Sequence, residues 1–130
     1  GHGATLNDRK IRVSTVDELS RSMLCTGFPY NVRERPDFAR DFATFTMNAQ
    51  AVRRDGSAAL DLAYVACGRF DGFWEDGLSP WDIAAGALLI FEAGGIVTNF
   101  KNEPLDIYNE QFLATNGLIH GAMMNLLTTK

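Results

Sequence analysis

Three carboxylates and a glycine-serine turn are the residues of this sequence whose types and positions could do chemistry. Asp82 follows Ser79-Pro80-Trp81, a strong helix start with Ser as the N-cap and Pro at the first helical position. A carboxylate there bonds free backbone N–H groups and complements the helix dipole. The small residues of Ala84-Ala85-Gly86-Ala87 let this helix pack closely, and a carboxylate held so rigidly also suits a metal ligand. Both interpretations of Asp82, cap and ligand, stay open.

The triplet Gly56-Ser57-Ala58 begins a second apolar helix, predicted over residues 57–68. Free N–H groups at a helix N-terminus bind anions or polar ligand oxygens, although a simple Gly/Ser cap explains the triplet better by itself. Asp61 lies one turn further along this helix, and a buried carboxylate must be paired. We therefore expect a salt bridge from Asp61 to Arg53, Arg54 or Arg69.

Glu75 ends an aromatic segment, residues 70–75, that is predicted as a strand, and a short loop separates it from the Asp82 helix. Folds of the α/β class place ligand groups where strand ends are followed by helix starts. Glu75 and Asp82 could therefore face one cleft. The alternative is that Glu75 and Asp76 are solvated loop charges.

The remaining reactive side chains exclude several kinds of site. Cys25 and Cys67 are isolated thiols in apolar segments, so we expect reduced core residues and a cytoplasmic protein. With only two histidines, a zinc site built from His and Cys is almost excluded. Any bound metal would be a hard ion such as Mg²⁺, held by carboxylates.

Composition limits the class of protein further. The chain has 130 residues, of which 46% are hydrophobic and 11% aromatic, so it can form one folded domain. A net charge of -4 and the lack of a basic run make nucleic acid a poor partner. No stretch approaches the roughly 18 apolar residues of a membrane span, so we expect no membrane partner.

The elements that must position these residues alternate along the chain. We expect helices over residues 37–50, 57–68, 79–93 and 117–128, and strands over 11–13, 20–26, 51–54, 70–75, 96–98 and 112–115. Such alternation favours an α/β fold, a layered sandwich with a mixed, largely parallel sheet flanked by helices.

Taken together, these segments resemble the inositol monophosphatase family. The run from Gly56 to Glu75 resembles that family's central helix and strand. Trp81-Asp82-Ile83-Ala84-Ala85-Gly86, followed by Glu92-Ala93-Gly94-Gly95, resembles its W-D-x-A-A-G … E-A-G-G signature. The opening segment, residues 1–14, and Thr26-Gly27-Phe28-Pro29 are also similar to family segments, so the resemblance covers nearly all of the chain.

The resemblance implies the C-terminal half of the inositol monophosphatase fold over residues 1–130. It also implies a Mg²⁺-dependent phosphate monoester hydrolase, of a family in which many members are inhibited by lithium. Carried over by motif, Asp82 would be a metal ligand and Glu75 would hydrogen-bond a substrate hydroxyl. Gly56, Ser57 and Ala58 would line the polyol ring of the substrate.

The sequence departs from the family at the main metal motif, D-P-x-D-G-T, which should lie upstream with an earlier glutamate and is not present. Glu103-Pro104-Leu105-Asp106 looks similar, but it follows the second signature and is interpreted as a loop. One motif ligand, Asp82, cannot hold the metal cluster or activate water. We therefore expect a truncated fragment that supplies the substrate-binding half and no catalytic residue.

That expectation implies two protein partners. One is the missing N-terminal half of the same protein. The other is a second copy of this chain, because the apolar surface exposed without that half would drive the chain to form homo-oligomers. The expected small-molecule partner is a phosphate ester of inositol or of a similar polyol. The alternatives are a sugar bisphosphatase or nucleotide 3′-phosphatase of the same superfamily, and a non-catalytic fragment that binds a partner.

Overall fold

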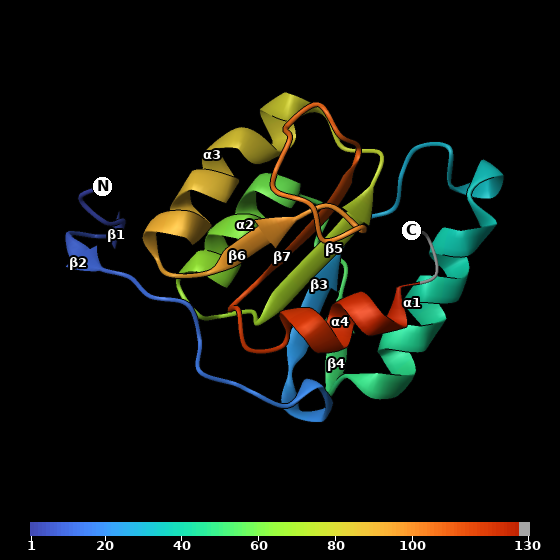
Figure 1. The fold of residues 1–130 in the computed structure, drawn as a ribbon, viewed down its shortest axis with the longest axis horizontal. Helices are drawn as coiled ribbons and strands as arrows, with labels where there is room; N and C mark the ends of the chain where they lie inside the picture. Colours follow the sequence, from blue (N-terminus) through green and yellow to red (C-terminus); the bar gives the residue numbers. More distant parts are fainter. Residues whose placement is uncertain (128–130) are drawn as a thin grey trace.

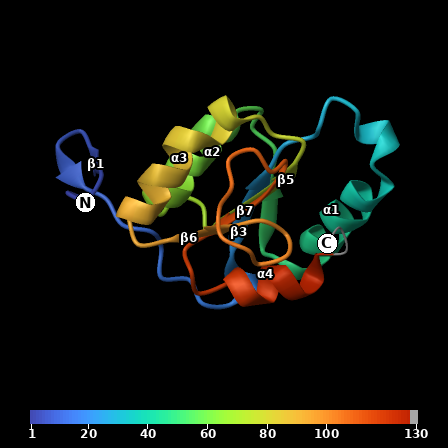
Figure 2. The same cartoon turned by 45° about the horizontal axis from the view of Figure 1, so that its top comes forward.

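The computed structural model describes residues 1–127, which fold into three layers with a sheet between two pairs of helices (Figures 1 and 2). Helices α2 (Ala58–Ala66) and α3 (Pro80–Glu92) cover one face of the sheet. Helices α1 (Pro36–Asn48) and α4 (His120–Leu126) cover the other. The predicted layered α/β sandwich is confirmed.

The central sheet has five strands in the order β4-β3-β5-β7-β6. They are β3 (Met23–Thr26), β4 (Ala51–Arg53), β5 (Gly72–Asp76), β6 (Ile96–Thr98) and β7 (Gln111–Thr115). β3 pairs in parallel with β4 and β5, whereas β7 pairs antiparallel with β5 and β6. The sheet is mixed, as predicted, and its parallel pairing is confined to the β4-β3-β5 half.

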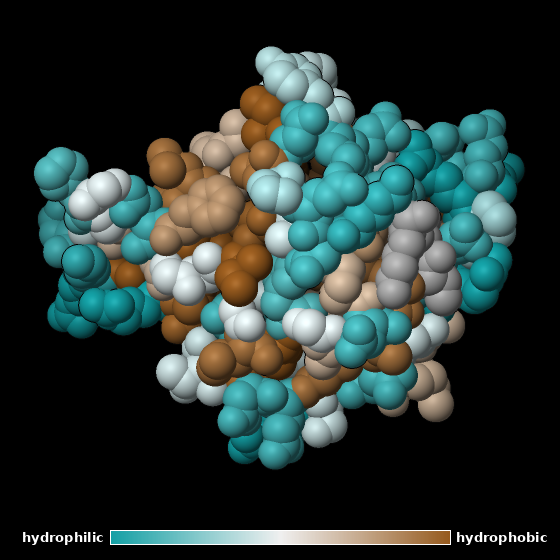
Figure 3. Space-filling model, in the orientation of Figure 1, coloured by the Kyte–Doolittle hydropathy of each residue, from teal (hydrophilic) through white to brown (hydrophobic). Residues whose placement is uncertain are grey.

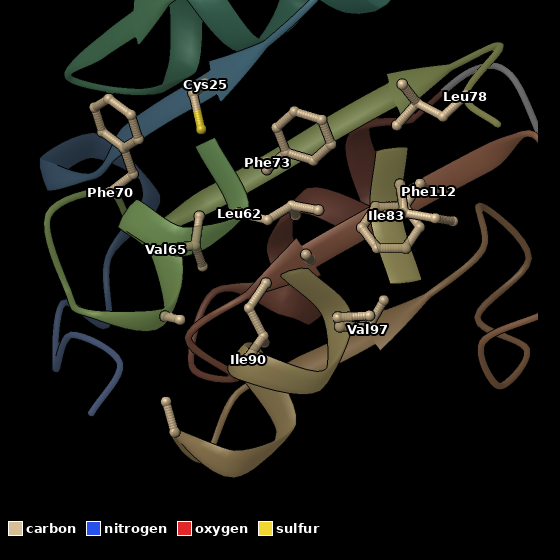
Figure 4. Close-up of a cluster of buried hydrophobic side chains, with 14 residues drawn as sticks. Cys25, Leu62, Val65, Phe70, Phe73, Leu78, Ile83, Ile90, Val97 and Phe112 are labelled. Atoms are coloured by element: carbon tan, nitrogen blue, oxygen red, sulfur yellow. The ribbon is translucent and has the colours of Figure 1, made fainter. Parts of the chain in front are cut away.

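Side-chain alternation along the central strands divides the core between the two faces of the sheet. Cys25 and Phe73 belong to a buried cluster with side chains of α2 and α3 (Figure 4). Their neighbours Leu24 and Trp74 belong to a second cluster with side chains of α1 and α4. Because both faces are covered, these strands are apolar on both sides and are predicted well by their sequence.

A glycine lets α2 and α3 approach each other closely. A Cβ placed on Gly86 of α3 would lie 2.5 Å from Cβ of Leu62 on α2, which is closer than real Cβ contacts come. Leu62 itself is fully buried in the cluster between these helices and the sheet (Figure 4). The close packing expected from the small residues of α3 is therefore confirmed.

The N-terminal segment differs from its prediction. The strand predicted over residues 11–13 is wrong, because β1 (Thr5–Leu6) and β2 (Arg9–Lys10) pair only with each other. Instead, the Val13 N–H donates to the carbonyl of Ala93, just after α3, at 3.1 Å. This segment therefore follows the helix layer and does not join the sheet.

The other elements begin and end within two residues of their predicted bounds, except at two starts that differ by three residues. The strand predicted from residue 20 begins only at Met23, because Leu19–Arg21 form a single 3-10 turn, η1. The last helix was predicted to begin at residue 117 but begins at His120. Its predicted end, residue 128, lies outside the described residues. A second 3-10 turn, η2 (Val32–Glu34), precedes α1.

Within residues 1–127, no helix combines the length and the apolar character needed to cross a membrane.

Candidate functional site

A cavity of about 360 Å³ lies where the parallel strands β3 and β5 end and where α2 and α3 begin. Its wall includes the whole set that the sequence motifs predicted for substrate and metal: Gly56, Ser57, Ala58, Glu75 and Asp82. Cavities of this size commonly bind small molecules. The expectation that Glu75 and Asp82 face one cleft is confirmed.

Ser57 is the N-cap of α2. Its Oγ accepts a hydrogen bond from the Leu60 N–H at 3.2 Å, which confirms the interpretation as a cap. Gly56 has φ +91°, a left-handed backbone that favours glycine, and it turns the chain into the helix. A helix leaves several N–H groups of its first turn without intrahelical partners, and Ser57 binds that of Leu60. Ala58, the first residue of the helix, lines the cavity.

Asp82 stands in the first turn of α3. Its Oδ2 accepts a hydrogen bond from the backbone N–H of Ser79 at 3.0 Å, so the interpretation as a helix cap is confirmed for this oxygen. The same side chain lines the cavity. Because an ionised carboxylate has about four lone-pair sites, one capping bond leaves capacity for another partner.

Glu75 and Asp76 lie within β5 and are 8% and 7% exposed, so the alternative that they are solvated loop charges is wrong. The position of Glu75 depends on Gly27, directly after β3. A Cβ on Gly27 would lie within 1.7 Å of Oε1 of Glu75, an impossible overlap. Burial and, to a lesser extent, the charges of Asp61 and Asp82 raise the pKa of Glu75 to about 7, although Arg54 opposes the rise.

Asp61 lies within α2, lines the same cavity and is only 1% exposed. Its Oδ1 is buried and has no hydrogen-bond partner in the part of the chain that the structure describes. Burial and, to a lesser extent, the charge of Asp55 raise the pKa of Asp61 to about 7.

The salt bridge predicted for Asp61 is wrong, because the candidate arginines are engaged elsewhere. Arg53 pairs with Asp55 at 3.4 Å, Arg54 lies 5.1 Å from the ring centre of Phe28, and Arg69 lies 5.1 Å from that of Tyr64. Arg54 and Phe28 both line the cavity, so the cation–π pair belongs to its wall.

The loop after β3 closes one side of the cavity with Gly27, Phe28, Pro29 and Tyr30. Arg35, further along this loop, forms ion pairs with Asp76 at the end of β5 and with Glu110 just before β7. These two ion pairs hold the loop against the end of β5 and the start of β7, next to Glu75.

The donor atoms only partly suit a metal ion. Asp61, Glu75 and Asp82 supply carboxylate oxygens, the ligands that Mg²⁺ prefers. Within residues 1–127, however, no group of three His, Cys, Asp or Glu side chains is arranged to hold a metal ion. These residues therefore do not by themselves fit a complete Mg²⁺ site. Both Cys25 and Cys67 are free thiols, as predicted, but only Cys25 is buried in the core; Cys67 is half-buried, so its placement in the core was wrong.

The sequence motifs did not point to Gly27, Arg54 or Asp61 as cavity residues. Gly27 directly follows a parallel strand, and the rule that ligand groups gather at such strand ends could have identified it. For Asp61, the available signal was a carboxylate one turn inside an apolar helix, which we interpreted as half of a salt bridge.

Known proteins are similar to this chain along its whole length. The sequence model described as the inositol monophosphatase family matches residues 1–130. "Inositol-1-monophosphatase" of Synechocystis sp. is 50% identical over 96% of this chain and 44% of that protein. "Putative Nus factor SuhB" of Neisseria meningitidis is 45% identical over 98% of this chain and 49% of that protein.

A solved structure agrees with these sequence relatives. The inositol monophosphatase from Anabaena (Nostoc) sp. PCC 7120 superposes with a TM-score of 0.94 at 55% identity, over 98% of this chain and 51% of that one. The chain therefore spans about half the length of the relatives it matches.

Proposed function

This chain belongs to the inositol monophosphatase family, and on that premise we propose that it is the substrate-binding half of a Mg²⁺-dependent phosphatase. Residues 1–130 form its C-terminal domain, and the substrate is a phosphate monoester of inositol or of a similar polyol. The observation that carries this proposal is the convergence of Gly56, Ser57, Ala58, Glu75 and Asp82 on one cavity. Because the relatives are about twice as long, the activity is that of the larger protein.

The role of each residue follows from its chemistry. The buried Glu75 carboxyl hydrogen-bonds a hydroxyl of the substrate and fixes the orientation of the ring. Gly56, Ser57 and Ala58 lie against the ring, where their small side chains leave room for it. The free N–H groups of the first turn of α2 can donate to its hydroxyl oxygens.

Asp82 is the metal ligand that this chain contributes. The other ligands come from the segment that corresponds to the remaining length of the relatives, because residues 1–127 hold no set of three suitable side chains. When bound, Mg²⁺ neutralises the charge of the phosphate ester during attack by water. The chain alone is therefore inactive, and lithium inhibits the assembled enzyme, as the family resemblance implies.

An apolar stripe on α3 is the surface to which the missing half docks. Trp81, Ala84, Leu88 and Phe91 recur at helical spacing and are all exposed. Figure 3 shows hydrophobic side chains gathered where Figure 1 draws this helix. A surface helix normally has polar residues on its outer face. Without the other half, the chain self-associates through this stripe, and light scattering should show less association for Leu88→Glu than for Lys101→Glu, a change outside the stripe.

The test of function restores the missing half. The complementary segment of the Synechocystis relative is mixed with this chain, and phosphate release from inositol 1-phosphate is measured with Mg²⁺. We expect no release from either piece, release from the mixture, and a loss on the order of 100-fold or more in Asp82→Asn, because a metal supplies several kcal/mol of charge stabilisation. The reassembled halves of the relative are the positive control. Activity of this chain alone, or full activity of the variant mixture, would contradict the proposal.

A second candidate function is binding of a partner without catalysis. It is favoured by the Neisseria relative, whose name, "Putative Nus factor SuhB", does not describe a hydrolase. A mixture that assembles but releases no phosphate from inositol 1-phosphate, a sugar bisphosphate or a nucleotide 3′-phosphate would support it. The free thiols Cys25 and Cys67 fit the reducing cytoplasm in which we place either function.

A further inference from the structure

Asp61 is a buried acidic side chain in the cavity wall to which the proposed function assigns no role. It is 1% exposed in an otherwise apolar helix, and its Oδ1 lacks a hydrogen-bond partner among the described residues. Leaving a buried carboxyl group unpaired is strongly unfavourable. Since no ion pair or hydrogen bond to this Oδ1 is found within residues 1–127, a bound molecule in the cavity that Asp61 lines would satisfy it.

The position of Asp61 shows where such a partner would bind. Asp61 lines the cavity one helical turn beyond Ser57, so it faces the same hollow as the start of α2. Glu75 enters this hollow from β5. Because Gly27 has no side chain, the carboxyl of Glu75 can lie close to the loop backbone. Asp61 and Glu75 thus line one cavity from α2 and β5, and the charge of Asp61 adds to burial in raising the pKa of Glu75.

A pair of buried carboxyl groups suits a particular chemistry. Two interacting carboxyls do not both ionise readily, so near neutral pH one can donate a proton in a hydrogen bond while another accepts one. A hydroxyl group also donates and accepts. Neighbouring hydroxyls of one ligand therefore match this pair better than an anion does. A metal ion fits less well, because no set of three ligands is found within residues 1–127.

We infer that Asp61 is a specificity-determining residue that hydrogen-bonds a second hydroxyl of the polyol whose first hydroxyl binds Glu75. This inference rests on the proposed function and deepens it, since two carboxyls on adjacent elements select a ligand with two suitably placed hydroxyls. A ligand with a single hydroxyl leaves one of the buried carboxyls unpaired and binds more weakly.

The test compares two substitutions that remove the same charge from the 130-residue chain. Asp61→Asn keeps a donor and an acceptor, whereas Asp61→Leu keeps neither. We expect the affinity for myo-inositol, measured by NMR titration, to fall about 10-fold or more in Asp61→Leu and to stay within about 3-fold in Asp61→Asn. Asp55→Asn is the matched control, because Asp55 carries a nearby charge but does not line the cavity.

A second measurement needs no substitution and so does not depend on the folding of a variant. The side-chain carboxyl ¹³C resonances of Asp61 and Glu75 are followed while myo-inositol is added, and we expect both to shift together. A shift of Glu75 alone, no shift at all, or unchanged affinity in folded Asp61→Leu would overturn the inference and leave a buried water as the partner of Asp61.

The failure of this inference differs from a failure of the proposed function. Phosphate release by the reassembled protein, together with inositol affinity that does not depend on Asp61, refutes the inference alone. Inositol binding that depends on Asp61, in an assembly that releases no phosphate, supports the inference and refutes the phosphatase.

Discussion

The two ends of strand β5 hold buried carboxylates in opposite circumstances. Asp71, just before the strand, is 6% exposed and accepts hydrogen bonds from Ser14 Oγ at 2.5 Å and from the Met23 N–H at 2.7 Å. Glu75, near the other end, is 8% exposed and faces a cavity that it shares with Asp61 and Asp82.

The difference in hydrogen-bond partners separates carboxylates that stabilise the fold from those that are available to bind a ligand. Asp71 connects the N-terminal segment to the sheet, and Asn116 extends this connection by donating to Ser14 Oγ and to the carbonyl of Val16. The cavity carboxyls instead lie among like charges, an arrangement that weakens the fold and is characteristic of functional sites. Burial alone therefore does not indicate the role of an acidic residue, whereas its partners do.

Removing the partnered carboxylate should have the largest effect on stability. Asp71→Ala leaves the Met23 N–H and the Ser14 hydroxyl without their acceptor, so we expect the free energy of unfolding to fall by about 3 kcal/mol. Urea denaturation measures this loss, and Asp17→Ala, an exposed surface aspartate, is the control. A loss below about 0.5 kcal/mol, the size of an ordinary surface effect, would break the comparison.

Crowding the cavity carboxylate should have the next largest effect. Gly27→Ala forces the Glu75 carboxyl to move, so we expect a loss of about 1–3 kcal/mol in stability, typical of overpacking, together with weaker inositol binding. Gly121→Ala in α4 is the matched control, because nothing lies within 4 Å of its added methyl group. If Gly27→Ala binds inositol normally, Glu75 does not need the position described here.

Neutralising the cavity carboxyls should change how stability depends on pH. The pKa of Glu75 is raised from 4.5 to about 7, so between these values the unfolded chain holds fewer protons and stability falls as pH rises. Asp61, raised from 3.8 to about 7, acts in the same direction. We therefore expect Glu75→Gln to be more stable than the parent chain at pH 8 and no more stable at pH 4.5, as urea midpoints at both values would show. A Glu75→Gln variant less stable at pH 8 would mean that this carboxylate holds the fold together, as Asp71 does.

A partnered histidine should give a dependence of stability on pH with the opposite sign. The ring of His120 bonds Thr98 and Thr115 at 2.8 and 2.9 Å, and burial lowers its pKa from 6.5 to about 4. The unfolded chain binds the proton first, so this group removes stability as pH falls from 6.5 to 4.

The hydrogen bonds around His120 also fix its proton. Thr98 Oγ1 donates to the carbonyl of Asn99, so Nε2 must donate to Thr98, while Nδ1 accepts from Thr115, whose oxygen accepts the Gly117 N–H. Ring ¹⁵N shifts should show this neutral form down to about pH 5, and a ring that is charged at pH 6 would contradict it.

Local signals made much of the fold predictable. The Ser79-Pro80 start and the glycines after Ala93 bounded α3 correctly, because caps act within one turn. The strand expected at residues 11–13 failed since its apolar residues pack against helices, and strand patterns do not identify the partner.

The sequence predicted which residues form the site, but not how they contact one another. Motifs indicated Glu75, Asp82 and the start of α2. No local sequence signal indicates that Gly27 lies close to Glu75 or that Asp61 lacks a partner among the described residues. Arg54 was a reasonable partner for Asp61 in sequence, yet it stacks on Phe28, which is 26 residues away along the chain. Such choices depend on tertiary packing, which spacing does not encode.

The close contact of Gly86 with Leu62 sets the distance between α2 and α3. Both α2 and α3 open onto the cavity at their first turns, and their separation is set further along, where the glycine meets the leucine. A side chain at residue 86 would touch no ligand, yet it would spread the two helices and widen the hollow between Ser57 and Asp82. The width of the cavity therefore depends on a residue outside its wall, because Gly86 sets how closely α2 and α3 approach.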